Sequence, residues 1–354
     1  MPNNQPWFDS YPETARRFDE SSIGHDHLAE VVTVAARDYR DRPAVSTQLP
    51  NGACATLTFG DVDRLTNDFA AYLRGVLGLE AGTPVALMSP NCIGFVVATF
   101  GIFKAGCICT NINPLYTAPE MEHQLNDSGA RVLVIIDLFG DKADAVVPNT
   151  DVQQVVTISL ADFFPQPRKA LIQFVMKRIK KMVPAMRSPH LTLPGAARKG
   201  AEHRKAHGTD ISSYRSGQSS NQAALYQYTG GTTGRSKGAE LTHGNILSNS
   251  TSTVSLVEET MDRANPGCSL VALPLYHITA FALIMIPSLV YGAHAIMIPS
   301  PRPPSNLKAA FENHRITHFS GINTLFAALL EEPWCKGEPL RHLKLCSSGG
   351  AAQL

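Results

Sequence analysis

The chain has 354 residues and a formal net charge of +1 at pH 7, and 44% of its residues are hydrophobic while 17% are charged. This balance is typical of a globular protein with a large core, and the length predicts two or more domains. The net charge provides no overall field that would favour a nucleic-acid partner. The seven cysteines include no CxxC pair, so we expect no disulfide framework or zinc site, and a reducing, cytoplasmic location.

Residues 1–55 show only weak periodicity, which predicts an N-terminal arm with one helix. The first residues, MPNNQPWFDSYPE, contain no basic segment followed by an apolar one, so they do not resemble a secretory signal. From Thr56 onward the pattern becomes regular. Thr58, with Asp61 three positions later, is predicted to cap a helix over 59–76.

Strands and helices alternate through residues 56–220, which predicts a first α/β subdomain. Asn91 is expected to cap a helix that ends near Ala105, and the TAPE sequence is a capping box for a helix that stops near Gly129. Short apolar runs predict strands at 83–89, 106–113, 131–137 and 152–159. This alternation requires crossover connections and therefore predicts a mainly parallel sheet.

A basic insertion interrupts this subdomain near residues 163–201, where the sequence has no acidic residue. Its segment 168–187 places five apolar residues on one helical face, namely Leu171, Val175, Ile179, Met182 and Val183. One interpretation is a helix that packs on the protein through this stripe. The other is an amphipathic helix that lies on the anionic inner face of a membrane as a peripheral contact.

The polar, glycine-containing tract 189–220 predicts a surface linker, and residues 221–354 then repeat the alternation as a second α/β subdomain. The expected fold is therefore α/β, with two αβα layered subdomains and mainly parallel sheets. The uncharged segment 264–301 contains a stretch, 278–298, that is long enough to span a bilayer. We interpret it as a buried helix, a stop at Gly292 and a buried strand.

The stretch YQYTGGTTGRSKGAELTH, residues 226–243, combines glycines and hydroxyl groups with a lysine, Lys237. A glycine-rich loop after a strand exposes backbone N–H groups that can surround an anion, and the lysine adds a mobile positive charge. The spacing differs from a Walker loop, because Ser236 precedes the lysine and Gly238 follows it. A surface hairpin without a ligand is the alternative.

This stretch resembles the phosphate-binding signature of the AMP-forming acyl-adenylate synthetases. Further segments match that family in the same order, and they are similar to bacterial long-chain fatty-acid–CoA ligases: INPLYTAPEMEHQLNDSGARVLV at 112–134, ALPLYHI at 272–278, GINTLFAALL at 321–330 and SSGGAAQL at 347–354. The resemblance implies the fold of the family's large N-terminal domain. It also implies ATP-dependent conversion of a long-chain fatty acid to acyl-AMP and then acyl-CoA, with ATP, Mg²⁺ and coenzyme A as cofactors or co-substrates.

The resemblance implies catalytic roles for Lys237 and for His277, which would lie near the acyl carboxylate and the α-phosphate. The other implied site residues bind the nucleotide and the acyl chain: Thr229, Gly230, Gly231, Thr232, Thr233, Gly234, Gly349, Gly350 and Ala351. Gly230 stands where the family more commonly has serine. Phe281, Ile284 and Met285 are candidates for the lining of an acyl tunnel, and a plain core role is the alternative.

The glutamate motif that binds Mg²⁺ in the family is not found in the chain, so the sequence predicts no metal ligand here. The small C-terminal domain of the family is not found either. We therefore expect an amino-terminal part of a ligase that is inactive alone. The alternatives are a chain that binds nucleotide or acyl groups without catalysis, or one half of a split enzyme. The sequence predicts no oligomeric state.

Overall fold

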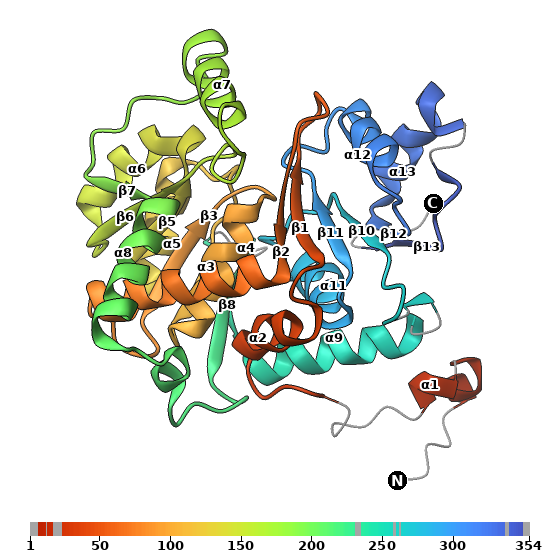
Figure 1. Ribbon diagram of the computed structural model, residues 1–354, viewed down its shortest axis with the longest axis horizontal. Coiled ribbons are helices and arrows are strands. Elements are labelled where there is room, and N and C mark those ends of the chain that lie inside the picture. Colours follow the sequence, from red (N-terminus) through yellow and green to blue (C-terminus); the bar gives the residue numbers. More distant parts are fainter. Residues whose placement is uncertain are drawn as a thin grey trace.

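A computed structural model of the chain describes residues 6–11, 13–16, 23–230, 235–257, 260–261, 263–336 and 340–349. Two sheets form its frame (Figure 1). The seven-stranded sheet has, in order, β7 (His190–Thr192), β6 (Gln154–Ile158), β5 (Val132–Ile136), β3 (Pro84–Met88), β4 (Ile108–Asn111), β8 (Ala223–Thr229) and β9 (Lys237–Thr242). The six-stranded sheet has β13 (Leu345–Ser348), β12 (His318–Gly321), β10 (Cys268–Val271), β11 (His294–Met297), β1 (Pro43–Gln48) and β2 (Cys54–Thr58).

Both sheets are parallel except at one edge, where β8 pairs with β9 and β1 pairs with β2 in antiparallel fashion. Helices cover the sheets, which confirms the predicted α/β class. They are α1 (Glu13–Arg16), α2 (Leu28–Tyr39), α3 (Phe59–Ala71), α4 (Ile93–Lys104), α5 (Ala118–Ser128), α6 (Gly140–Val146), α7 (Arg168–Phe174), α8 (Leu193–His207), α9 (His243–Val257), α10 (Ile278–Ala280), α11 (Ile286–Tyr291), α12 (Lys308–Asn313) and α13 (Asn323–Leu330).

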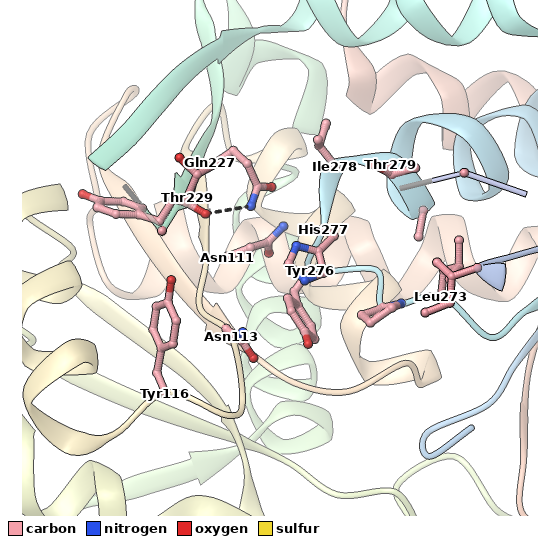
Figure 2. Close-up of a pocket in the computed structure, with 16 residues that line it drawn as sticks. Asn111, Asn113, Tyr116, Gln227, Thr229, Leu273, Tyr276, His277, Ile278 and Thr279 are labelled. Atoms are coloured by element: carbon pink, nitrogen blue, oxygen red, sulfur yellow. Dashed lines mark hydrogen bonds between the residues drawn. The ribbon is translucent and has the colours of Figure 1, made fainter. Parts of the chain in front are cut away.

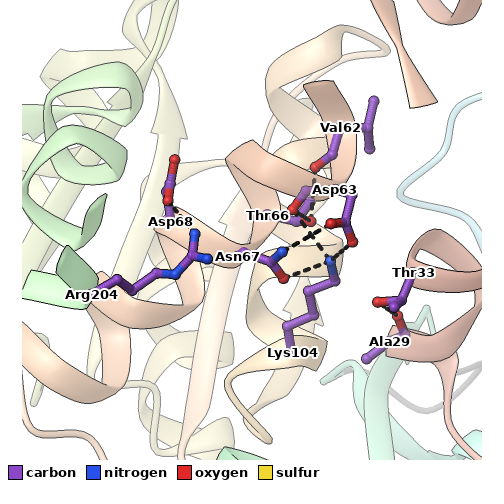
Figure 3. Close-up of polar contacts among 9 residues, drawn as sticks. All are labelled: Ala29, Thr33, Val62, Asp63, Thr66, Asn67, Asp68, Lys104 and Arg204. Carbon is purple, nitrogen blue, oxygen red and sulfur yellow. Dashed lines mark hydrogen bonds and ion pairs between the residues drawn. The ribbon is translucent and has the colours of Figure 1, made fainter. Parts of the chain in front are cut away.

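Helix α4 lies at the centre of the molecule, and all twelve of its residues are buried. Its amine, Lys104 Nζ, reaches the carboxylate of Asp63 at 2.5 Å and the amide oxygen of Asn67 at 2.8 Å, both on α3 (Figure 3). Burial lowers the pKa of Lys104 to about 8, against the opposing effect of the Asp63 carboxylate. This cluster therefore attaches α3 to the central helix.

Several helices begin or end at the residues that local sequence signals predict. Thr58 and Asp61 form a capping box at the start of α3, and Thr117 and Glu120 form one at the start of α5. Gly129 ends α5 in the left-handed region with φ of 67°. The predicted cap at Asn91 is wrong, because Cys92 holds the N-cap position of α4 and the Asn91 side chain bonds elsewhere.

The tract 189–220 is not a linker, since it contains β7 and the fifteen-residue helix α8. Helix α8 packs against α3 through small residues, and a Cβ at Gly200 would lie 1.8 Å from the carbonyl oxygen of Asp68. A helix that buries glycine and alanine lacks the large apolar stripe on which the prediction relied. Its composition therefore looked like that of a loop.

The two sheets do not correspond to the predicted division of the chain into residues 1–55, 56–220 and 221–354. Strands β8 and β9 follow residue 220 but belong to the seven-stranded sheet, and β1 and β2 belong to the six-stranded sheet. Strand β1 lies inside the predicted arm. The sequence does not indicate this strand because three of its buried residues, Ser46, Thr47 and Gln48, are polar and interrupt the hydrophobic pattern of a core strand.

The uncharged segment 264–301 folds as predicted. It contains α10, a π-helical turn over Phe281–Met285, α11 with Gly292 as its left-handed C-cap, and the buried strand β11. Within the described ranges, no helix has both the length and the apolar character needed to cross a bilayer.

The basic insertion contains α7, which a π-helical turn extends over Val175–Ile179 and which projects at the upper left of Figure 1. Packing through the predicted stripe is wrong for Leu171, Ile179 and Met182, which are 62%, 61% and 51% exposed. Met176, which lies outside the predicted stripe, is the buried side chain of this turn.

Candidate active site

A pocket of about 720 Å³ opens where the carboxyl ends of strands from both sheets approach each other (Figure 2). Parallel α/β sheets bind ligands at this edge, and the volume is in the range of small-molecule sites. The lining residues are Asn111, Asn113, Tyr116, Gln227, Tyr228, Thr229, Gly230, Leu273, Pro274, Tyr276, His277, Ile278, Thr279, Ala280, Ile322 and Gly349.

The predicted phosphate-binding loop connects β8 to β9, so its two ends are the strands of a hairpin. Thr229 is paired directly with Lys237 across the hairpin, and both residues are exposed. Thr229 and Gly230 line the pocket, whereas Lys237 is not among the lining residues. The predicted residues Gly231, Thr232, Thr233 and Gly234 lie outside the described residues.

Helix α5 holds β8 and the residue directly before β9. The hydroxyl group of Tyr228 donates to Asp127 Oδ2 at 2.6 Å, and His123 Nε2 donates to the carbonyl oxygen of Ser236 at 3.2 Å. Burial, followed by the Asp127 carboxylate, raises the pKa of Tyr228. A Cβ at Gly238 would lie 2.9 Å from the Tyr228 ring, so a larger residue at this position of β9 would have to displace that ring.

His277 stands at the N-cap position of α10 and lines the pocket. Its backbone N–H donates to the carbonyl oxygen of Pro274 at 3.1 Å, and its ring lies 4.6 Å from that of Tyr276. Partial burial lowers the pKa of His277 below its usual value of 6.5, so the imidazole is neutral at pH 7. A neutral imidazole can donate one N–H to a carboxylate or phosphate oxygen.

Gly349 reaches the same pocket at the end of β13, where its N–H donates to the carbonyl oxygen of Gly321 at 3.2 Å. The structure thus brings Thr229, Gly230, His277 and Gly349 together. The predicted residues Gly350 and Ala351 lie outside the described part of the chain.

The pocket is lined by two buried carboxamides that the sequence patterns do not indicate. Asn111 and Gln227 are register partners on the neighbouring strands β4 and β8, and both line the pocket near His277 (Figure 2). The Oε1 atom of Gln227 is buried and has no hydrogen-bond partner among the described residues. The available signal is weak: Asn111 is the last residue of the short, fully buried strand β4, and Gln227 stands between two tyrosines in β8.

The candidate tunnel residues Phe281, Ile284 and Met285 do not line this pocket. All three are buried. The Phe281 ring packs against the rings of Phe100 and Phe103, with distances of 6.0 and 6.1 Å between ring centroids. These contacts favour the core interpretation. Among the described residues there is no group of three histidine, cysteine or acidic side chains that could hold a metal ion.

The model of the AMP-binding enzyme family matches residues 32–353. The chain belongs to this family. The chain is 35% identical to the long-chain-fatty-acid–CoA ligase of Haemophilus influenzae over 347 residues, which cover 98% of this chain and 59% of that protein. The ligase of the same description from Bacillus subtilis is 30% identical over 354 residues, 99% of this chain and 60% of that one.

A solved structure shares the fold. The anthranilate CoA ligase AuaEII, solved in complex with anthranoyl-AMP, superposes with a TM-score of 0.75 at 20% identity, over 95% of this chain and 57% of that one. The likeness confirms that the two layered sheets are the fold implied by the resemblance. The chain spans about three fifths of the length of the relatives that it matches.

Proposed function

We propose that this AMP-binding chain takes part in the ATP-dependent activation of a long-chain fatty acid. In the first step a carboxylate oxygen attacks the α-phosphorus of ATP, and the bond to the bridging oxygen of pyrophosphate breaks, which gives acyl-AMP. In the second step the sulfur of coenzyme A attacks the acyl carbon, and AMP leaves as the thiol proton is lost. The relatives named long-chain-fatty-acid–CoA ligases support this substrate class.

The observation that supports this proposal is that Thr229, Gly230, His277 and Gly349 line the same pocket. The Thr229 hydroxyl group and the amides that follow it would hold the β- and γ-phosphates, with Lys237 as a positive charge beside them. Neutral His277 would donate an N–H to the acyl carboxylate and orient it toward the α-phosphorus. Bound Mg²⁺ would supply further positive charge to the phosphates.

The test is a pair of measurements on the chain. Titration calorimetry with ATP, and with a non-hydrolysable acyl-sulfamoyl-adenosine that mimics acyl-AMP, is expected to give saturable binding of both. Palmitate-dependent exchange of labelled pyrophosphate into ATP would assign the complete first step to this chain, whereas binding without exchange would make it a binding chain. Failure to bind either nucleotide would overturn the proposal.

We also propose that the α7 patch contacts an anionic membrane surface, where long-chain fatty acids partition. The patch consists of four apolar side chains that are each more than half exposed: Leu171, Phe174, Ile179 and Met182. Exposed basic residues accompany them, namely Lys177, Arg178, Lys180 and Lys181. Exposed apolar groups beside cations are the combination that binds the interface of anionic lipids.

Flotation with liposomes tests the membrane proposal. Binding to phosphatidylglycerol vesicles is expected to exceed binding to phosphatidylcholine vesicles and to weaken in 0.5 M salt. Replacing the four basic residues by glutamine should abolish it, whereas the matched control Arg198, Lys199 and Lys205 to glutamine on α8, all exposed, should not. Equal binding by both variants would contradict the proposal.

A further inference from the structure

The side chain of Asn91 makes three hydrogen bonds to a segment of the other sheet. Asn91 lies in the turn between β3 and α4 and is 3% exposed. Its Nδ2 donates to the carbonyl oxygens of Val271 and Leu273, both at 2.9 Å, and its Oδ1 accepts from the N–H of Leu275 at 2.8 Å. The backbone of residues 271–275 therefore bonds both N–H donors and the oxygen acceptor of the Asn91 carboxamide.

These contacts fix the segment that carries His277. Leu273 and Leu275 flank Pro274, and the carbonyl oxygen of Pro274 accepts the N–H of His277 at 3.1 Å. Leu273, Pro274 and His277 line the pocket, whereas Asn91 does not. Asn91 thus stands behind the pocket wall, without access to a bound ligand.

The turn that carries Asn91 is itself anchored to the six-stranded sheet. The N–H of Ile93 donates to Thr47 Oγ1 on β1 at 2.9 Å, and Thr47 is buried. The first residue of α4 is therefore attached to β1, and the turn before it is attached to the end of β10 and the segment that follows. Since the pocket lies between the two sheets, this attachment sets the position of His277 relative to the ends of β4 and β8.

We propose that Asn91 is a positioning residue of the active site: it holds segment 273–277 so that His277 faces Asn111 and Gln227. The ligand-dependent part of this proposal rests on the proposed function. Aspartate has the same shape, but an ionised carboxylate would face two carbonyl oxygens at the distances of the present bonds and could donate to neither. Serine is too short to span all three partners.

The experiment is a double-mutant cycle that uses the acyl-sulfamoyl-adenosine as its probe. Asn91→Ser and Asn91→Asp are each expected to weaken its binding at least tenfold, and His277→Ala should also weaken it. Asn91 acts through the segment that carries His277. The double variant Asn91→Ser, His277→Ala should therefore bind the probe with about the same affinity as whichever single variant binds it less tightly. Asn126→Ser, at an exposed asparagine with one hydrogen bond, is the matched control and should bind normally.

Binding by Asn91→Ser within twofold of the wild type, or multiplication of the two single effects in the double variant, would overturn the positioning role. Amide hydrogen exchange gives a second readout that needs no ligand. In Asn91→Asp, which preserves the side-chain volume, the amides of Leu275 and His277 should exchange at least tenfold faster while those of β8 and β9 keep their rates.

A wild-type chain that does not bind the probe would mean that the proposed function has failed, and hydrogen exchange would then decide the role of Asn91 by itself. Unchanged exchange at Leu275 and His277 in Asn91→Asp would overturn it.

Discussion

The hydroxyl group of Tyr228 donates a 2.6 Å hydrogen bond to the carboxylate of Asp127, and this bond fixes β8 to α5 just before the glycine-rich loop begins. A hydrogen bond to a charged group contributes about 1.5–3 kcal/mol to stability. Tyr228→Phe and Asp127→Ala are each expected to lower the free energy of unfolding by an amount in that range, and the double variant by little more than one of them. Urea unfolding measures all three. Additive losses would show that the two side chains act independently.

Lys237 faces Thr229 across the hairpin but does not line the pocket in the described structure. If it pairs with the polyphosphate of ATP, Lys237→Ala should weaken ATP binding by about 1.5–3 kcal/mol, which is the range for hydrogen bonds to charged groups. Titration calorimetry checks this, with Lys308→Ala as the control on an exposed helix. An unchanged ATP affinity in a folded Lys237→Ala variant would remove Lys237 from the proposed site.

His27 and His243 form a buried pair whose ring centroids are 3.4 Å apart. The Nδ1 atoms accept backbone N–H groups, from Ala29 at 3.1 Å for His27 and from Leu28 at 3.3 Å for His243. Burial is the main cause that lowers the pKa of His27 to about 4 and the pKa of His243 to about 2.

The unfolded chain therefore binds protons at these histidines below about pH 6.5, whereas the folded chain does not. The contribution of these two histidines to the free energy of unfolding is fully present above pH 6.5. It is lost as the pH falls toward 4, at up to about 1.4 kcal/mol per pH unit for each histidine. Urea unfolding at pH 7.5, 6.0 and 5.0 should show a shallower loss for His243→Gln than for wild type. His190→Gln, at an exposed histidine, should follow the wild type, and an identical slope for all three proteins would contradict the prediction.

Lys104 and Asp63 are expected to respond unequally to substitution. Lys104 is buried, whereas its partner Asp63 has a side chain that is 25% exposed and can be hydrated when the amine is removed. Asp63→Ala leaves a buried charge without its carboxylate, which costs about 3 kcal/mol or more, whereas Lys104→Met replaces that charge with an apolar chain and should cost much less.

The pH dependence of Lys104 has a definite sign. Its pKa is about 8 in the folded chain and 10.5 when unperturbed, so between these values the unfolded state binds more protons and stability from this group rises with pH. Comparing unfolding of the wild type and Lys104→Met at pH 7.5 and 9.5 isolates this contribution. A difference between the two proteins that does not change with pH would contradict it.

The local elements could be predicted because their causes are local. The capping boxes at Thr58 and Thr117 and the glycine stops at Gly129 and Gly292 depend on residues within one or two helical turns, and all four occur where the sequence indicates. The order of motifs also indicated the family, since PLYH and the glycine-threonine loop are continuous in the chain. The position of His277 after a buried strand followed from the same patterns.

The sequence by itself determined the α/β class, the main helix ends and the residues from which a phosphate-binding site could be built. Only the tertiary structure decided that Asn91 bonds across to segment 273–277 rather than capping α4, and that Asn111 lies beside Gln227. The physical reason is that these partners are more than one hundred residues apart. A carboxamide has the same hydrogen-bonding groups wherever it stands, so only the packing of the two sheets selects its partner.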